Sequence, residues 1–552
     1  MRRRGITDMD NHTSTSFRYC ARPLAPRYIP PAMASTVQDI ISEEKKNSIQ
    51  RTISPPDIKQ GEIADRDLDQ AEIFLRDNNI SDDDLSALLA DEAGVKKLVK
   101  RVDWSLMPLL CITYLLQYID KQSLSYAAVF DLFESTNINS GQYGWLVSIF
   151  YFGYLLAEWP ASYLAQRLPT GTVVSCSIII WGSILMITSA CTNSTGLMIC
   201  RFLLGCFESF ITPVFMLIVG QWYQRSEQSS RAGTFYCFNG VGASMGGILF
   251  FAVGQQTGAF AVWRSIFLLA GGATVCWGVL LLFLLPNSLM TAKRFTPMEK
   301  ATLIARTRQN QTGVFNPTIK SAQIWEALTD PQIWLLFLFV LLNETINGGL
   351  ANFSKLIVKG ISNNNALLTT AYGIPTGAWQ VLWVFSGPWL ASRFTNIRTY
   401  IMALYVLPTI IATALLWKVP HAGNKGLLMA IYIAGSYVAS LVIALQLPVN
   451  NVAGYTKRVT STAFVFLAYC AGNIIGPHAF LNEEAPTYPT GCIVTMACAS
   501  GQVLVAFCLR ALLIRRNRRR DELYGKVMQG TEGSGAMQDQ TDFENKEFRY
   551  SY

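Results

Sequence analysis

Residues 104–130 read WSLMPLLCITYLLQYIDKQSLSYAAVF, and this stretch decides the fold class. A membrane-spanning helix needs roughly 20 mostly apolar residues, and the run as far as Ile119 is built almost entirely of such residues. Two opposite charges, Asp120 and Lys121, then interrupt it before a second apolar patch. The stretch predicts a membrane span, and the two charges within it need a separate explanation.

Eleven further apolar runs follow in the chain. Its 552 residues are 51% hydrophobic and 15% charged, which is too apolar and too long for one ordinary soluble core. The twelve predicted spans are 104–130, 142–163, 171–190, 196–222, 232–254, 263–285, 332–353, 368–391, 399–417, 427–448, 459–479 and 491–514. A polar stretch divides them six plus six. We expect an all-α polytopic membrane protein with two pseudo-symmetric six-helix bundles.

Positive charges in the short loops predict the orientation. The even-numbered connections are rich in Lys and Arg, whereas the odd-numbered ones carry only Lys355, Lys359, Lys418 and Lys425, with Arg264 at the edge of a span. Because Lys and Arg are enriched in cytoplasmic loops, both termini are predicted to be cytoplasmic. The expected parts are a disordered N-terminal tail (1–100), an N-terminal bundle (101–286), a central loop (287–330), a C-terminal bundle (331–514) and a basic, then polar, tail (515–552).

The two halves resemble each other at one offset. LAQR at 164–167 and LASR at 390–393 are 226 residues apart, and the same offset matches Arg231 with Lys457. It also maps spans 1, 2 and 5 onto spans 7, 8 and 11. Two related bundles that face one central site are the architecture of a transporter that works by rocking.

Spans 1 and 4 of the first half carry four charged residues: Asp120, Lys121, Arg201 and Glu208. At about 1.5 Å per residue, the first two lie roughly 24 Å from the cytoplasmic side, level with Arg201. Neighbours on a helix do not face each other, so Asp120 and Lys121 each need a partner elsewhere. Charges inside a membrane are costly and are functional by default. The competing explanation is a structural charge network that locks spans 1 and 4 together.

The formal charges of these four residues sum to zero, which suggests coupling. If Asp120 or Glu208 takes up a proton, the site becomes positive, and an organic anion then enters at lower electrostatic cost. Asp120 and Glu208 are therefore the predicted proton sites. Lys121 and Arg201 are the predicted ligands of the substrate carboxylate, Arg201 as a bidentate fork.

At the offset of 226 these four positions correspond to neutral residues, so we expect the second bundle to supply mainly polar or apolar walls. Its candidate substrate-binding residues are Asn347, Gln380, Tyr437 and Asn473, and Asn343 and Glu344 lie on the same span. For each of them an interhelical hydrogen bond is an equally good explanation.

Other positions suggest gating or packing. Glu158 is expected to pair with an arginine of the gate region, and Arg167 and Arg393 are further gating or structural candidates. The run GVGASMGG at 240–247 includes Gly242 and Gly246 at helix-packing spacing.

Composition argues against several other classes. The 12 cysteines are scattered without metal-ligand spacing, and no nucleophile–base constellation appears, so we expect no metal, no cofactor and no enzymatic activity. The net charge of +8 lies in short loops and in RRNRRR at 515–520. This distribution favours a membrane surface over nucleic acid, and RRNRRR is either a lipid-headgroup contact or ordinary solvated sequence.

The motifs resemble those of the major facilitator superfamily. RFLLGCFE at 201–208 is similar to its RxxxGxxE signature, and GASMGG at 242–247 to its fifth-span glycine motif. In SYLAQRLPTGT, Gln166 and Pro169 depart from the loop motif GxLADRxGRR. YIDKQSLSYAAVFDL, EWPASYLAQRLPTG and GNIIGP resemble the fungal allantoate permease branch of the anion:cation symporters over about residues 100–515.

The resemblance implies proton-driven uptake of a small organic anion such as allantoate, ureidosuccinate, nicotinate or pantothenate. It also implies a monomer in a fungal plasma membrane. Two alternatives remain open: a facilitator or exchanger that needs no proton, and a nutrient sensor that does not transport.

Overall fold

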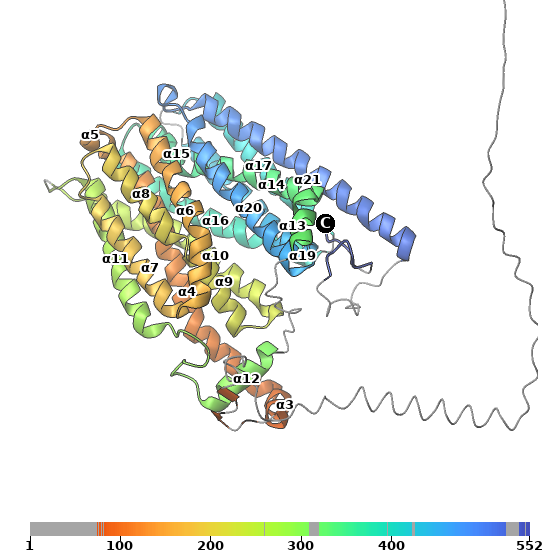
Figure 1. The fold of residues 1–552 in the computed structure, drawn as a ribbon. Helices are drawn as coiled ribbons and strands as arrows, with labels where there is room; N and C mark the ends of the chain where they lie inside the picture. The colour runs from red at the N-terminus through yellow and green to blue at the C-terminus, as the bar shows by residue number, and fades with distance from the viewer. Residues whose placement is uncertain are drawn as a thin grey trace, which may run out of the picture. The chain divides into compact units, whose positions relative to one another are not determined.

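The computed structural model describes residues 74–75, 77–78, 80, 82–258, 260–308, 320–394, 396–421, 425–525, 540–546 and 548–552. Every regular element among these residues is helical (Figure 1). The predicted all-α class is therefore confirmed. Most of the predicted N-terminal tail lies outside the described residues.

The first half of the chain forms one group of packed helices. In chain order they are α3 (Asp82–Ala90), α4 (Glu92–Val129), α5 (Leu132–Thr136), α6 (Ser140–Arg167), α7 (Thr170–Thr188), α8 (Ser194–Glu208), α9 (Ile211–Trp222), α10 (Arg225–Gly254) and α11 (Val262–Leu284). Helix α4 packs against α10 and α11, α6 against α8, and α7 against α11. We call this group the N-terminal bundle.

The central region carries α12 (Pro297–Arg308) and α13 (Ser321–Thr329), and the second half forms the C-terminal bundle. Its elements are α14 (Pro331–Ile346), the π-helical η1 (Asn347–Ala351), α15 (Asn352–Ile361), α16 (Ala366–Arg393), α17 (Arg398–Lys418), α18 (Gly426–Ala434), α19 (Tyr437–Asn451), α20 (Tyr455–Ile475), the short η2 (Gly476–Ala479) and η3 (Asn482–Glu484), and α21 (Pro489–Tyr524). Helix α17 packs against α21, and α14 against α20 and α21.

Within the described residues, 10 helical segments are long and apolar enough to cross a membrane. The predicted second and eighth spans are helices as well, α6 and α16, with 28 residues each. Both helices also contact the other bundle, α6 through α20 and α16 through α10. A helix that packs against protein on one side needs an apolar surface only toward lipid. Each of the predicted spans thus coincides with helical structure.

The two bundles carry similar ion pairs, whose basic residues are equivalent at the offset of 226 and whose acidic residues differ from that offset by one position. In the N-terminal bundle Arg231 Nη2 of α10 lies 3.1 Å from Asp103 Oδ2 of α4. In the C-terminal bundle Lys457 Nζ of α20 lies 3.4 Å from Oδ2 of Asp330, the N-cap residue of α14. The sequence offset of 226 already matches Arg231 with Lys457. The repeat therefore extends from sequence to tertiary contacts.

Two segments that the sequence assigns to polar tails are helical. Helix α3 and the start of α4 fall within residues 1–100, and the Asp91 carboxylate caps α4 by accepting a hydrogen bond from the backbone N–H of Gly94 at 3.0 Å. Helix α21 continues through the basic run 515–520 as far as Tyr524. The expected disorder of the N-terminal tail therefore does not extend to residues 82–90 and 92–100, because polar composition alone does not register a capped helix, and the predicted boundaries stay predictions.

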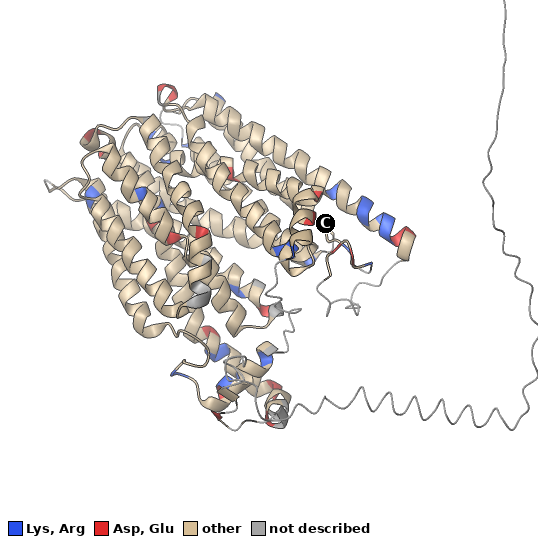
Figure 2. Ribbon diagram, viewed as in Figure 1, with Lys and Arg blue, Asp and Glu red and all other residues tan. Residues whose placement is uncertain are grey.

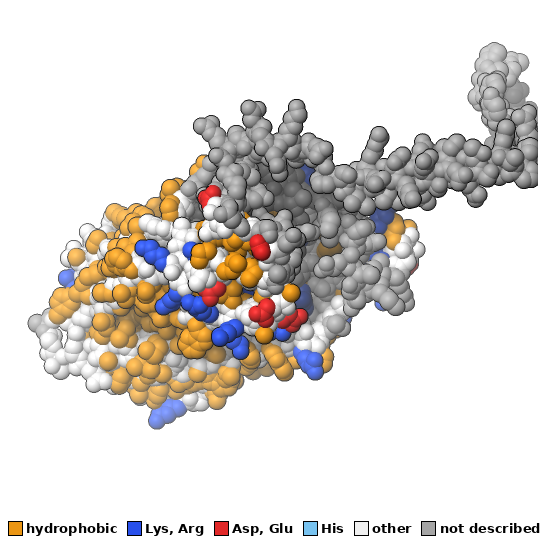
Figure 3. Space-filling model, turned by 90° about the horizontal axis from the view of Figure 1, so that it is seen from below, with side chains coloured by type: hydrophobic (Ala, Val, Ile, Leu, Met, Phe, Trp, Pro, Cys, Tyr) orange, Lys and Arg blue, Asp and Glu red, His pale blue; other side chains and the backbone are white. Residues whose placement is uncertain are grey.

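Charged side chains lie mostly toward the ends of the bundles, and a small group lies inside them (Figure 2). Seen from below, basic and acidic side chains gather on the end that carries α3 and α12, with hydrophobic side chains around them (Figure 3). At this end Arg101 of α4 pairs with Glu299 of α12 at 2.5 Å. Charged ends and apolar sides suit a chain that crosses a bilayer.

Candidate functional site

Asp120 faces two helices of its own bundle. Its side chain is buried, and Oδ2 accepts hydrogen bonds from Trp181 Nε1 in α7 at 2.7 Å and from the Thr274 hydroxyl in α11 at 2.9 Å. The other oxygen, Oδ1, has no hydrogen-bond partner among the described residues. Neutral donors on two neighbouring helices therefore hold this carboxyl in place.

Lys121 points away from Asp120 and forms an ion pair with Glu208. Lys121 Nζ lies 3.1 Å from Oε1 of Glu208 in α8. The same oxygen accepts a hydrogen bond from Gln117 Nε2 at 3.0 Å. The side chain of Glu208 is 3% exposed, whereas that of Lys121 is 31% exposed. The prediction that Asp120 and Lys121 each need a partner on another helix is confirmed.

Two glycines bring α6 and α8 close enough for this arrangement. A Cβ on Gly205 would collide with the backbone oxygen of Phe150, and a Cβ on Gly153 with the backbone oxygen of Phe202. Glycine at these positions allows the two backbones to touch. Gly205 is the glycine of the RFLLGCFE motif, so it sets the position of the helix that ends at Glu208.

Arg201 is a buried cation with free hydrogen-bond donors. It is 5% exposed, and its Nε and Nη2 have no hydrogen-bond partner in the described part of the chain. The guanidinium carbon lies 5.7 Å from the ring centre of Phe267 in α11. Asp120 and Glu208 lie within electrostatic range without forming an ion pair with Arg201. Buried donors without acceptors are costly, and an anion with its own acceptor oxygens removes that cost.

The C-terminal bundle holds a buried carboxyl in a hydrogen-bonded network. Oε2 of Glu344 accepts hydrogen bonds from Asn473 Nδ2 at 2.6 Å and from Asn347 Nδ2 at 3.1 Å. Asn347 Oδ1 accepts a hydrogen bond from the Tyr437 hydroxyl at 3.0 Å. Glu344 is fully buried, its Oε1 has no partner among the described residues, and Lys121 lies within electrostatic range.

This network changes the expected picture of the second bundle. Asn347, Tyr437 and Asn473 contact one another and Glu344, as the alternative of interhelical hydrogen bonds anticipates. Mainly polar or apolar walls were expected in this bundle, whereas the buried carboxyl of Glu344 places an ionisable group there. Gln380 has a different neighbour, since its Oε1 accepts a hydrogen bond at 3.0 Å from the Tyr118 hydroxyl of the N-terminal bundle.

Lys355 is a second buried cation, and the sequence places it wrongly in a loop. The helical segment that begins with α14 continues through η1 and α15 to Ile361, beyond the end of the predicted span at residue 353. Lys355 is 4% exposed, and its Nζ lies 5.0 Å from the ring centre of Tyr126 in α4. No described carboxylate forms an ion pair with it. The strongly amphipathic stretch NFSKLIVKGI is the sequence pattern that could have indicated a helix around Lys355.

The bundles touch at the end that lies away from α3 and α12. The Tyr143 hydroxyl donates a hydrogen bond to the backbone oxygen of Asn352 at 3.3 Å, and the Ser148 hydroxyl donates one to that of Ile474 at 2.8 Å. The ring centres of Trp145 and His478 are 4.8 Å apart. These contacts join α6 to the end of the seventh and eleventh spans.

Glycines also form the contact between α10 and α16. A Cβ on Gly377 would collide with the backbone oxygen of Gly240 and the backbone nitrogen of Ser244. Gly242 packs inside its own bundle instead, where a Cβ would lie 2.7 Å from the Leu115 oxygen. A Cβ on Gly246 would have its nearest neighbour at 3.6 Å, which is ordinary contact. The predicted packing role therefore fits Gly242 and not Gly246.

Replacing Gly377 by alanine is expected to destabilise this arrangement of the bundles. Overpacking of a tight contact costs roughly 1–3 kcal/mol, so the thermal unfolding midpoint of the purified protein in detergent should fall clearly below that of the wild type. Gly246→Ala is the matched control, because its added methyl has room. Equal midpoints for the two variants would show that the α10–α16 contact is not tight.

The predicted gating residues lie apart from this site. Arg393 is exposed at the end of α16, and the side chain of Arg167 lies outside the described residues. Oε2 of Glu158 is buried without a hydrogen-bond partner in the described part of the structure. The predicted pairing of Glu158 with a gate-region arginine stays a prediction.

Comparisons with known proteins give a consistent result. The sequence model described as Major Facilitator Superfamily matches residues 110–477. The chain is 34% identical over 475 residues to an uncharacterized transporter of Schizosaccharomyces pombe, which covers 86% of this chain and 90% of that protein. It is 30% identical over 469 residues to the allantoate permease of Saccharomyces cerevisiae, with 83% and 86% covered.

A solved structure shows the same fold. A bacterial homologue of the human lysosomal transporter Spinster, in an inward-facing and occupied conformation, superposes with a TM-score of 0.55. The likeness covers 77% of this chain and 98% of that one at 16% sequence identity.

Proposed function

The chain belongs to the Major Facilitator Superfamily, and from that premise we propose that it is a proton-coupled symporter that imports a small organic anion by alternating access. Its relatives are transporters and not enzymes. The observation that carries the proposal is the ion pair of Lys121 with Glu208, in which Lys121 is partly exposed and Glu208 is buried.

The ion pair supports coupling because one ammonium has two competing partners. While Glu208 is ionised, it holds Lys121 at 3.1 Å and compensates its charge. A substrate carboxylate that takes Lys121 would leave Glu208 as a buried, unpaired anion, which is strongly unfavourable. A proton on Glu208 removes that penalty. Proton and anion therefore bind cooperatively at this pair.

Asp120 is the less suitable proton carrier of the two predicted carboxyls. It accepts hydrogen bonds from Trp181 and Thr274 inside the bundle, and no cation forms an ion pair with it among the described residues. We assign Asp120 to positioning α4 so that Lys121 faces Glu208. Glu344, which lies within electrostatic range of Lys121, is a second acidic group near the site.

Two further cations favour an anionic substrate. Arg201 offers buried donors without acceptors, and Lys355 is buried beside Tyr126 without a carboxylate partner among the described residues. Burying a cation in a membrane protein is costly, so buried cations are found where they bind a ligand or form an ion pair. Because the allantoate permease is among the relatives, allantoate is the first substrate to test, followed by ureidosuccinate, nicotinate and pantothenate.

We also propose an orientation, and with it the side of the membrane toward which the site opens. With both termini cytoplasmic, as the loop charges predict, the contacts of α6 with Asn352 and Ile474 close the outer side. The anion would then leave toward the cytoplasm. We place the transporter in the plasma membrane as a monomer, in line with uptake of an external nutrient.

Uptake under an imposed proton gradient separates this proposal from its alternatives. Proteoliposomes with an acidic outside should accumulate labelled allantoate, or another anion of the panel, above the external concentration. A pH difference of about one unit stores about 1.4 kcal/mol per proton, which corresponds to roughly tenfold accumulation. Equilibration without accumulation would indicate a facilitator or exchanger, and binding without flux a sensor.

A further inference from the structure

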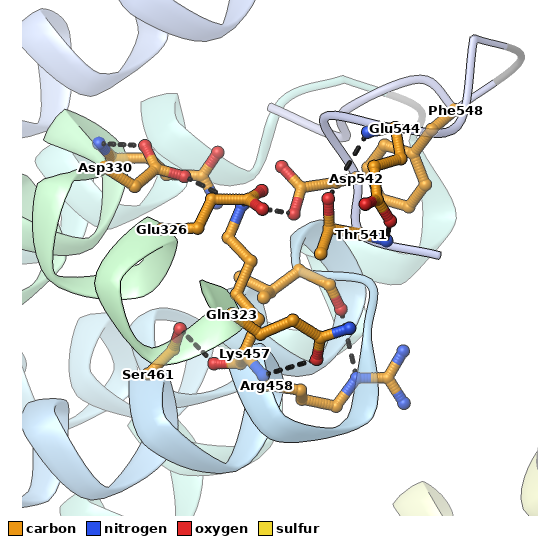
Figure 4. Close-up of polar contacts among 12 residues, drawn as sticks. Gln323, Glu326, Asp330, Lys457, Arg458, Ser461, Thr541, Asp542, Glu544 and Phe548 are labelled. Atoms are coloured by element: carbon orange, nitrogen blue, oxygen red, sulfur yellow. Dashed lines mark hydrogen bonds and ion pairs between the residues drawn. The ribbon is translucent and has the colours of Figure 1, made fainter. Parts of the chain in front are cut away.

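The end of the chain folds back onto the C-terminal bundle. Residues 540–546 and 548–552, here called the C-terminal segment, lie against the ends of α13, α20 and α21 (Figures 1 and 4). The segment is rich in aromatic residues and carries two carboxylates, Asp542 and Glu544, beside two basic residues, Lys546 and Arg549, whereas the run before it, RRNRRR, is basic. Its carboxylates and rings are the groups that can bind basic side chains of the bundle.

Lys457 is the centre of this contact (Figure 4). Its side chain is fully buried, and Nζ lies 2.6 Å from Asp542 Oδ1 and 2.9 Å from Glu326 Oε1. The Asp330 carboxylate lies 3.4 Å away. The ring of Phe543 lies over the ammonium at 3.8 Å from its centre, a cation–π contact. A single ammonium thus joins α13, the start of α14, α20 and the C-terminal segment.

The basic run of α21 divides between two faces. Arg516 pairs with Asp330 at 2.7 Å, and Arg520, one turn later, donates hydrogen bonds to the backbone oxygens of Asn545 at 3.2 Å and Phe548 at 2.8 Å. Arg515, Arg518 and Arg519 are exposed instead. Two of the arginines therefore bind the segment or its neighbours. The sequence suggests only lipid contact or plain solvation for this run, and neither explanation anticipates such contacts.

Tyr550 anchors the last residues. It is 2% exposed, its hydroxyl donates a hydrogen bond to Asp542 Oδ2 at 2.7 Å, and its backbone N–H donates one to Asn517 Oδ1 at 3.0 Å. Burial and the neighbouring Asp542 carboxylate raise the pKa of Tyr550 well above its ordinary range, so the phenol remains a donor. Ser551 exchanges hydrogen bonds with Asn451 of α19, two of them at 2.8 Å.

The corresponding pair in the N-terminal bundle has no such cover. The side chains of Arg231 and Asp103 are 22% and 29% exposed, whereas those of Lys457 and Asp330 are fully buried. The offset of 226 makes the two basic residues equivalent. One reason for the difference is Asp542, a residue outside the repeat, whose carboxylate contacts Lys457.

We propose that the ends of α13, α14, α19, α20 and α21 form a binding site for an aromatic peptide that carries a carboxylate, and that the chain's own C-terminal segment is its ligand. Two contacts determine binding of the segment: the ion pair of Asp542 with Lys457, and the hydrogen bond from the backbone N–H of Tyr550 to Asn517. Because residues 526–539 tether the segment, binding is intramolecular and has a high effective concentration. Docked, the segment holds these helix ends together; released, it leaves Lys457 with only Glu326 and Asp330.

The experiment uses the full chain with a specific protease site inserted between residues 525 and 540. The protein folds with its segment attached and is cut afterwards, so a folding defect does not imitate loss of binding. Gel filtration and mass spectrometry then show whether the peptide of residues 540–552 stays with the cut protein. A labelled synthetic peptide of the same residues, added in increasing amounts, measures the affinity.

We expect the cut wild type to retain the peptide and Asp542→Asn to lose it, with at least roughly tenfold weaker binding of the corresponding synthetic peptide, because a charged hydrogen bond to a buried cation is lost. Glu522→Gln, which neutralises an exposed carboxylate of α21, is the matched control and should bind as the wild type does. The absence of saturable binding of the wild-type synthetic peptide to the cut protein would refute the binding site. Retention of the Asp542→Asn peptide with unchanged affinity would refute the role of the Lys457 contact.

Discussion

Glu208→Gln is expected to abolish accumulation of the anion against its gradient while leaving exchange of labelled for unlabelled anion intact. The glutamine cannot carry the proton, yet its amide oxygen keeps an acceptor for Gln117, which donates to Glu208 at 3.0 Å in the wild type. Lys121 loses its carboxylate, but its side chain is 31% exposed and stays solvated. The variant should therefore fold and bind the anion without requiring a proton.

The measurement is uptake into proteoliposomes with an acidic outside, followed by exchange at equal pH. Wild-type protein should reach roughly tenfold accumulation for a pH difference of about one unit, and Glu208→Gln should only equilibrate. Glu92→Gln is the control, because Glu92 is 82% exposed and its ion pair among the described residues is with Lys96 on the same helix. Normal accumulation by Glu208→Gln would mean that another carboxyl carries the proton. Asp120→Asn is then the next variant to test.

Arg201→Ala should lose most of the affinity for the anion. The guanidinium presents two buried nitrogens without acceptors among the described residues, so a carboxylate placed there gains charged hydrogen bonds worth about 1.5–3 kcal/mol. The loss corresponds to roughly 10- to 100-fold weaker binding. Arg201→Lys keeps the charge but not the planar fork, and it should lie between the wild type and Arg201→Ala.

Equilibrium binding of labelled allantoate, or of whichever anion of the panel is transported, to purified protein gives these affinities. Arg515→Ala, which removes an exposed arginine of α21, should bind the anion as the wild type does. An unchanged affinity of Arg201→Ala would mean that Arg201 is a structural charge near Asp120 and Glu208 and does not contact the substrate.

Helix periodicity was sufficient to predict the N-terminal part of the site. Asp120 and Lys121 are neighbours on one helix, so they must point in different directions. The structure places Asp120 against Trp181 and Lys121 against Glu208. Hydropathy likewise located the helices that carry the twelve predicted spans, because a lipid-facing surface must be apolar whatever the neighbouring helix is.

The sequence was insufficient where a contact depends on the partner helix. The sequence pattern assigns Lys355 to a loop. In the structure a π-helical turn after α14 continues the helical segment to Ile361, so Lys355 lies within it. Gly377 lies outside the glycine motif, and its role becomes visible only when α16 touches Gly240 of α10. The docking of Asp542 on Lys457 joins residues 85 positions apart in the chain. No local pattern reports such pairings.

The central claim is that a proton on Glu208 frees Lys121 for the substrate anion. The most direct test is the number of protons taken up when the anion binds to purified protein in a weakly buffered solution, followed with a pH indicator. The account predicts uptake of about one proton per bound anion by the wild type over the pH range in which the free site is ionised, and none by Glu208→Gln. Binding by the wild type without proton uptake, or equal uptake by both proteins, would contradict it.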